Sequence, residues 1–257
     1  MLIQRMLLIG LAVCTLSIQA EVIEKNVKLP GGLGEGVIYT NTDTTQAGPG
    51  VIVVHEWWGL NDYARSRARQ LAGLGYSAIA VDMYGTGKVA QHPDDAKAFM
   101  QAAFAESDTM NARFNAAKTL LSDLESVDAK KIYAIGYCFG GGVVLDQARQ
   151  GNDLAGVASF HGMLGTDEPA QKDKVKARIL VATGAADPYV PTEQVVAFVQ
   201  EMTNAEAEFE LLSFPGVLHS FTDVGATEKG KKFGMPAAYD ENADKVSWAA
   251  LLSMLKD

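Results

Sequence analysis

A cysteine lies between glycines at a spacing typical of a catalytic nucleophile. The segment reads Gly136-Tyr137-Cys138-Phe139-Gly140 and connects an apolar run to a stretch with helical spacing. Small residues two positions before and after the central residue permit the sharp strand-to-helix turn called a nucleophile elbow. The positive end of the following helix favours the thiolate over the thiol. The pattern predicts that Cys138 is a nucleophile. The alternative is a small buried hydrophobic residue.

A nucleophilic cysteine needs a base, and the base needs an acid that orients it. After such an elbow the chain order is nucleophile, acid and then histidine. Asp187 follows one strand-like run, in Ala186-Asp187-Pro188, and His219 follows the next. This order predicts Cys138, His219 and Asp187 as the reacting set. His161 precedes any suitable acid, so we expect it to be structural, with a place in the pocket wall as the alternative.

The loop after the first long strand supplies the other half of the predicted site. It reads His55-Glu56-Trp57-Trp58-Gly59. A backbone N–H from this loop and the N–H of the residue after the nucleophile together stabilise an oxyanion. We assign these donors to Trp57 and Phe139. A free charge on Glu56 would oppose the oxyanion, so we expect Glu56 to act with Cys138 rather than to be a solvated loop residue.

The elements that must position these groups alternate along the chain. Strands are expected at 50–55, 76–82, 131–137, 154–160, 178–183 and 209–214, and helices at 62–74, 94–106, 109–125, 139–150, 192–202 and 242–255. Continuous apolar runs indicate strands buried on both faces of a parallel sheet. Residues 22–28 and 34–40 indicate a hairpin around Pro30-Gly31-Gly32. The prediction is one α/β domain with the α/β-hydrolase fold, a mostly parallel central sheet flanked by helices and an antiparallel N-terminal hairpin.

One segment, 222–240, shows no clear periodicity and is long for a loop in a compact domain. It contains Phe233, Met235, Pro236 and Tyr239. Two interpretations stay open: these residues form the rim of a pocket, or they pack the loop onto the domain.

Residues 1–20 have the composition of a secretory signal peptide. Arg5 precedes an apolar run that ends near Ala20 and is short for a membrane span. We expect cleavage near Ala20, a mature domain over 21–257 and a periplasmic or secreted protein without stable membrane insertion. The alternatives are an uncleaved anchor and a lipid attached to Cys14.

Composition narrows the set of partners. The 257 residues carry a formal net charge of −9, and removing Arg5 with the first 20 leaves 21 basic against 31 acidic residues. An acidic chain without a basic stripe argues against nucleic acid as a partner. His55, His92 and His161 show no metal-ligand spacing, so we expect no metal and no cofactor. We favour a monomer whose partner is a small molecule.

Together these residues resemble the dienelactone hydrolases, the cysteine-nucleophile branch of the α/β-hydrolases, from about residue 50 to the C-terminus. The resemblance is carried by His55-Glu56-Trp57-Trp58-Gly59-Leu60-Asn61, Asp82-Met83-Tyr84, Gly136-Tyr137-Cys138-Phe139-Gly140-Gly141, Ala186-Asp187-Pro188-Tyr189-Val190-Pro191 and His219-Ser220-Phe221. It implies a Cys138–His219–Asp187 triad that cleaves an ester or lactone. It also implies that Glu56 contacts the resting thiol and takes its proton when substrate binds.

The chain departs from the family where substrate is bound. Members that act on dienelactone grip its carboxylate with two arginines, and this chain has Thr86 and Asp223 at those positions. Lys88 lies near the first position, whereas Asp223 is expected to repel an anion. Neutral esters, lactones and thioesters therefore suit the site as well as a dienelactone does.

The remaining candidate pocket residues are mostly aromatic, and ordinary packing is the alternative for each. They are Trp58, Tyr84, Phe160, Tyr189 and Ser220, and they join Thr86, His161 and Asp223 as candidates for the pocket wall. Two other functions stay open. One is a thioesterase or acyltransferase that uses the same triad, and the other is an exported thiol sensor or binding protein without turnover.

Overall fold

The computed structural model describes residues 21–44 and 46–256. The expected signal peptide, its cleavage site near Ala20, and Cys14 lie outside the described residues. Within 21–44 and 46–256, none of the helices combines the length and the apolar character that crossing a membrane requires.

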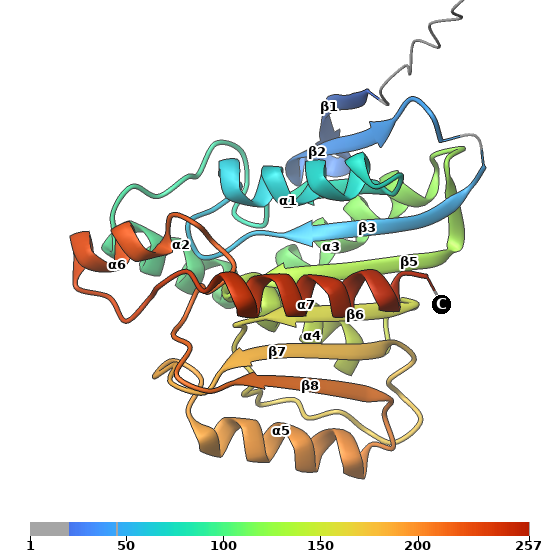
Figure 1. Ribbon diagram of the computed structural model, residues 1–257. Coiled ribbons are helices and arrows are strands. Elements are labelled where there is room, and N and C mark those ends of the chain that lie inside the picture. Colours follow the sequence, from blue (N-terminus) through green and yellow to red (C-terminus); the bar gives the residue numbers. More distant parts are fainter. Residues whose placement is uncertain (1–20, 45, 257) are drawn as a thin grey trace, which may run out of the picture.

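A single eight-stranded sheet forms the centre of the molecule (Figure 1). Its strands are β1 (Val22–Leu29), β2 (Gly34–Asn41), β3 (Gly48–Val54), β4 (Ser77–Val81), β5 (Val127–Tyr137), β6 (Gly156–Phe160), β7 (Arg178–Gly184) and β8 (Phe209–Phe214). The spatial order is β1-β2-β4-β3-β5-β6-β7-β8. The pairs β1–β2 and β2–β4 are antiparallel, and all later pairs are parallel. The predicted α/β-hydrolase fold with an antiparallel N-terminal hairpin is confirmed.

Helices cover both faces of the sheet. They are α1 (Asp62–Gly73), α2 (Pro93–Ala105), α3 (Ser107–Ser122), α4 (Phe139–Arg149), α5 (Thr192–Asn204), α6 (Ala226–Phe233) and α7 (Glu241–Met254). Buried side chains of α1 and α7 belong to one apolar cluster, and those of α3, α4 and α5 belong to the other. Along β3, Val51 and Val53 face the first cluster while Ile52 and Val54 face the second. Successive side chains of a strand point to opposite faces of the sheet. A strand with helices on both faces therefore needs apolar residues at every position, as in β3.

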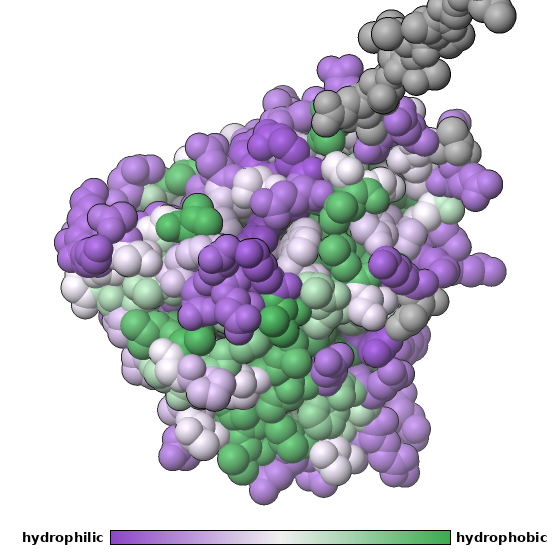
Figure 2. All heavy atoms as spheres, viewed as in Figure 1, coloured by the Kyte–Doolittle hydropathy of each residue, from purple (hydrophilic) through white to green (hydrophobic). Residues whose placement is uncertain are grey.

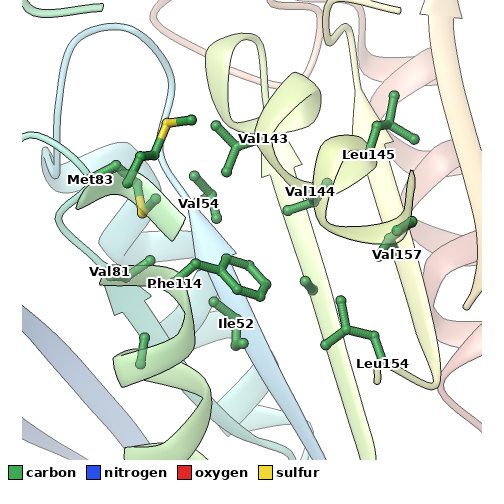
Figure 3. Packing of buried hydrophobic residues seen from close by; sticks show 14 of the residues in the cluster. Ile52, Val54, Val81, Met83, Phe114, Val143, Val144, Leu145, Leu154 and Val157 are labelled. Atoms are coloured by element: carbon green, nitrogen blue, oxygen red, sulfur yellow. The ribbon is translucent and has the colours of Figure 1, made fainter. Parts of the chain in front are cut away.

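The larger cluster lies under α3 and α4. Figure 3 shows Phe114 of α3 beside Ile52 of β3, with Val143 and Val144 of α4 on the neighbouring part of the sheet. Phe114, Ile52 and both valines are fully buried. Burying one such side chain contributes about 1.5–3 kcal/mol, so this layer anchors α4, the helix that begins directly after Cys138.

The opposite face is less completely covered. Figure 1 shows α1 and α7 in front of the sheet, with β7 and β8 below α7. Figure 2 shows an apolar surface in that lower region. The half-buried Leu212 and Phe214 of β8 and Trp248 of α7 pack on the cluster of this face.

The segment 222–240 contains a helix, so the expectation of an irregular segment was wrong. Helix α6 spans Ala226–Phe233 and ends at Gly234, which has a left-handed φ of 65°. Only Ala226 and Gly230 of this helix are buried. Two small buried residues give almost no apolar pattern, and glycine is a poor helix former, so the hydrophobic pattern of the sequence does not predict this helix. The segment packs back on the domain through a bridge between His219 and Ala237.

Candidate active site

The turn between β5 and α4 holds Cys138 in a strained conformation. Its φ of 53° and ψ of −114° lie outside the regions that non-glycine residues prefer. Its N–H donates to the carbonyl of Phe160 at 3.0 Å. A Cβ at Gly136 would lie 2.0 Å from the Gly140 carbonyl oxygen, so the chain can close this tightly only with glycine there. The half-buried sulfur stands at the N-terminus of α4 and lines a cavity.

His219 and Asp187 come together from two neighbouring loops. Asp187 follows β7, His219 follows β8, and His219 Nδ1 lies 2.6 Å from Asp187 Oδ2. The other carboxylate oxygen accepts the N–H of Tyr189 at 2.8 Å, which fixes the acid in place. A donating Nδ1 leaves Nε2 as the ring nitrogen that serves the sulfur.

The charge of His219 depends on these partners. Burial lowers its pKa, but attraction to the neighbouring Cys138 sulfur and the bond to Asp187 outweigh burial and raise the pKa to about 10. The ring therefore favours the imidazolium form.

Two backbone amides, in the loop after β3 and at the start of α4, have no acceptor among the described residues. Over the described residues, no protein group accepts the N–H of Trp57. The N–H of Phe139 is the first of α4, where the helix itself offers no acceptor, and none is found elsewhere in the described part of the chain. Backbone N–H groups inside a protein are rarely left unpaired, so both amides are candidates for binding a ligand oxygen.

Glu56 is buried and lines the same cavity as Cys138. Its Oε1 accepts a hydrogen bond from Ser220 Oγ at 2.8 Å, and its Oε2 has no partner within the described residues. The hydrogen bond found for this carboxylate among the described residues is the one to Ser220, and a contact of Glu56 with the resting thiol stays a prediction. Burial, and then the charge of Asp223, raise the pKa of Glu56, with Lys229 and Ser220 opposing them.

A cavity of about 370 Å³ joins these groups. Eight of the predicted site residues line it: Glu56, Trp57, Trp58, Cys138, Tyr189, His219, Ser220 and Asp223. Met235, one of the residues in the segment 222–240, also lines it, so the rim interpretation holds for that side chain. The wall is otherwise mainly apolar.

Four predicted pocket residues lie outside the cavity wall. Tyr84 is buried and donates its hydroxyl to the Trp57 carbonyl at 3.1 Å, so it supports the loop from behind. Phe160 stacks on Tyr137 in the core, and Thr86 is exposed. His161 is fully buried behind His219, with a ring distance of 5.1 Å, and its Nε2 is 2.7 Å from the Thr222 hydroxyl. Its structural role is the interpretation that the contacts favour.

Asp223 is not a free anion. Its Oδ2 accepts a hydrogen bond from Lys229 Nζ of α6 at 2.7 Å, and its Oδ1 accepts the N–H of Gly225 at 2.8 Å. The expected repulsion of an anionic substrate is therefore largely cancelled by the lysine. Lys88 does not line the cavity, and the second cation in its wall is Lys97 of α2.

The sequence analysis missed several wall residues. Lys97 and Met100 come from α2, Met163 follows β6, and Lys229 comes from α6. These residues belong to segments far from Cys138 in the sequence, and none sits in a motif. The three-residue spacing of Lys97 and Met100 places both on one side of a helix, and this spacing is the sequence feature that could have indicated a shared surface. Among the described residues there is no group of three histidine, cysteine, aspartate or glutamate side chains that could hold a metal ion.

Comparisons with known proteins agree with this geometry. The model of the dienelactone hydrolase family matches residues 35–257. Protein usf of Aquifex pyrophilus is 29% identical over 179 residues, which cover 68% of this chain and 77% of that protein. The uncharacterized protein K02A2.1 of Caenorhabditis elegans is 36% identical over 153 residues, covering 58% of this chain and 93% of that protein.

Solved structures give the same result. The crystal structure of the dienelactone hydrolase-like promiscuous phosphotriesterase P91 from metagenomic libraries has a TM-score of 0.83 and 31% sequence identity. The match covers 91% of this chain and 98% of that one. With a family match over most of its length, the chain belongs to the dienelactone hydrolase family and is a hydrolase of the ester or lactone type.

Proposed function

We propose that the chain hydrolyses an ester or lactone through a covalent intermediate on Cys138. The observation that carries this proposal is that the strained Cys138 and the Asp187-bound His219 line one cavity together with Trp57. The N–H groups of Trp57 and of Phe139, the residue after Cys138, have no acceptor among the described residues. Nucleophile, base, orienting acid and oxyanion donors are the parts that acyl transfer needs.

The proposed reaction has two halves. The Cys138 thiolate attacks the carbonyl carbon, and the oxygen takes up negative charge between the N–H groups of Trp57 and Phe139. His219 gives its proton to the leaving oxygen as the bond to carbon breaks, which leaves a thioester on Cys138. His219 then takes a proton from water, the hydroxide attacks the thioester, and the acid product leaves while the thiol is restored.

Glu56 is proposed to accept the thiol proton when substrate enters and to return it to the sulfur when the acid product has left. A raised pKa makes its carboxylate a better proton acceptor, and its unpaired Oε2 is free to receive one. The Ser220 hydroxyl holds the side chain near the sulfur without neutralising it.

The cavity wall favours a mainly apolar acyl group. Trp57, Trp58 and Met100 contribute apolar surface. The wall contains two lysines: Lys229 is paired with Asp223, and Lys97 has no ion-pair partner among the described residues. We propose neutral esters or lactones as substrates and include a dienelactone because Lys97 can still meet a carboxylate.

The test is an assay of the protein with short p-nitrophenyl esters and with a dienelactone, beside a Cys138→Ala variant. Turnover that disappears in the variant, together with a mass increase on Cys138 equal to the acyl group, supports the proposal. Turnover that survives the substitution contradicts it.

Three other outcomes correspond to other functions. Faster product formation with added alcohol or amine acceptors indicates an acyltransferase, and a preference for acyl thioesters indicates a thioesterase. Rapid peroxide oxidation of Cys138 without turnover indicates a thiol sensor. Because a similar structure is a promiscuous phosphotriesterase, a phosphotriester belongs in the substrate panel.

We also propose that the protein is exported and loses residues 1–20. The support is the charged start and apolar run of the N-terminal sequence. Fractionation of expressing cells and the mass of the recovered protein test this, because cytoplasmic protein of full mass would contradict it.

A further inference from the structure

His55 is a buried residue that the proposed reaction does not use. It follows β3 directly, is fully buried, and makes two hydrogen bonds. The N–H of Met83 donates to its Nε2 at 3.1 Å, and its Nδ1 lies 2.5 Å from the carbonyl oxygen of Glu56. The ring thus joins the loop after β3 to the loop after β4.

These partners determine where the ring carries its proton. A backbone N–H can only donate, so Nε2 must accept, and Nδ1 must carry the hydrogen that it donates to the Glu56 carbonyl. Burial lowers the pKa of His55 to about 4, so the ring stays neutral at ordinary pH. His55 is therefore held in one tautomer with a directed N–H bond.

That bond acts on the peptide unit that carries the Trp57 amide. The Glu56 carbonyl and the Trp57 N–H belong to one planar trans unit, so they point in opposite directions. When the Glu56 carbonyl points toward His55, the Trp57 N–H points away from His55. Trp57 itself lines the cavity. The same carbonyl accepts the N–H of Gly59 at 3.2 Å, and the Trp57 carbonyl is held by Tyr84.

His55 also supports the second amide donor. Its ring stacks on Phe139 with a centroid distance of 5.7 Å and an angle of 25°. Its carbonyl accepts the N–H of Gly140 at 3.1 Å, which docks the start of α4 against the same loop. One buried side chain and its own backbone therefore contact both peptide segments that supply the unpaired amides.

We propose that His55 is a positioning residue that directs the Trp57 N–H toward the substrate oxygen and holds it there against a peptide flip. The inference rests on the proposed cysteine-hydrolase function.

The test compares two reactions of Cys138 in the full chain. Acylation by a p-nitrophenyl ester develops an oxyanion and is measured as the burst of p-nitrophenolate. Alkylation by iodoacetamide uses the same sulfur but forms no oxyanion, so it reports nucleophile reactivity alone. The variants are His55→Phe, which keeps a ring but removes both hydrogen bonds, and His55→Asn, whose amide nitrogen takes the place of Nδ1 and can donate to the Glu56 carbonyl. His92→Phe is the control at an exposed histidine.

We expect His55→Phe to slow acylation by about 10²–10³-fold, the effect of losing one oxyanion donor, with alkylation changed by less than about twofold. His55→Asn should recover most of the acylation rate, and His92→Phe should match the wild type. If the Phe variant does not fold, His55→Gln replaces it with the same expected loss, because its amide reaches the place of Nε2 and leaves the Glu56 carbonyl without its donor.

Other outcomes overturn the inference. If His55→Phe slows acylation and alkylation equally, His55 supports the fold in general and does not position the Trp57 amide. If His55→Phe leaves acylation unchanged, His55 has no positioning role. If the wild type is alkylated at Cys138 but acylated by no ester or lactone, the proposed function fails, and the role of His55 falls with it.

Discussion

At the scale of single residues, the chemistry of this site comes from burial and pairing rather than from residue type alone. Two histidines illustrate this. His219 keeps a raised pKa because a sulfur and a carboxylate face it, whereas burial without an anionic hydrogen-bond partner lowers the pKa of His55. The same type of side chain therefore favours its charged form in one place and its neutral form in the other, and the proton-carrying role that we propose for His219 depends on this difference.

Asp187→Asn should separate the acid from its histidine. The amide keeps the size of the side chain but removes the charge that helps to raise the pKa of His219. We expect kcat/KM to fall by about 10²–10⁴-fold and the His219 titration to move to lower pH. Steady-state kinetics and NMR of the imidazole measure both, with the exposed Asp95→Asn as control. An unchanged titration would show that Asp187 does not stabilise the imidazolium.

Glu56→Gln should stabilise the protein while it lowers activity. The unfolded chain loses the Glu56 proton near its ordinary pKa of 4.5, but the folded protein loses it only at higher pH. Unfolding is therefore favoured as pH rises through this interval, and Glu56 destabilises the fold at neutral pH. We expect the variant to be more stable by about 1–3 kcal/mol at pH 7.5, with the difference vanishing below pH 4.5.

Denaturant unfolding at the two pH values measures this difference, and the exposed Glu125→Gln is the matched control. A variant that is less stable than the wild type at pH 7.5 would show that Glu56 is stabilised in its charged form.

At the scale of elements, the site depends on how closely α4 approaches β3. A Cβ at Gly140 would lie 2.5 Å from the Val54 carbonyl oxygen and 2.6 Å from that of His55. Both neighbours are backbone atoms, which cannot move aside as a flexible side chain can. Two positions further on, at Gly142, the nearest atom would be at 3.6 Å, an ordinary contact distance.

The pair Gly140→Ala and Gly142→Ala should therefore have opposite effects. Gly140→Ala should push α4 from the loop, destabilise the fold by roughly 1–3 kcal/mol, and reduce acylation of Cys138. Gly142→Ala should stabilise it by about 0.5–1 kcal/mol, because alanine is the better helix former. Thermal unfolding and burst kinetics of both variants check this, and equal effects of the two substitutions would contradict it.

At the scale of the whole molecule, one buried cation connects segments that are far apart in the sequence. Arg67 of α1 donates to the Thr222 carbonyl, in the loop that follows His219, and to Asp244 of α7 at 2.6 Å. Its guanidinium also stands 5.2 Å from the centre of the Trp248 ring. The loop that carries His219 is thus fastened to two helices of one face of the sheet.

Arg67→Met should loosen this face. Removing one partner of a buried ion pair typically costs about 3–5 kcal/mol, which for a chain of this size is roughly 6–20 °C in Tm. Activity should fall as well, even where the variant is folded, since the Thr222 carbonyl loses its donor. Arg65→Met, whose ion pair with Glu24 is looser at 4.0 Å, should change Tm little. Calorimetry of both variants tests this, and equal melting would contradict it.

Much of the architecture was predictable from local patterns. The apolar runs marked every parallel strand to within a few residues, and the glycines around Cys138 marked the turn. Periodicity and turn chemistry are properties of neighbouring residues, so they can be read without knowing the fold. Helix α6 was not predicted because its buried side consists of Ala226 and Gly230, which give no hydrophobic pattern.

The amino-acid sequence by itself determined the fold class, the family and the order of Cys138, Asp187 and His219 along the chain. Only the tertiary structure decided that Glu56 binds Ser220, that Lys229 neutralises Asp223, and that His55 lies behind the Trp57 peptide. The reason is that each of these contacts joins side chains or loops whose separation in space follows from packing, while local propensity fixes only the elements between them.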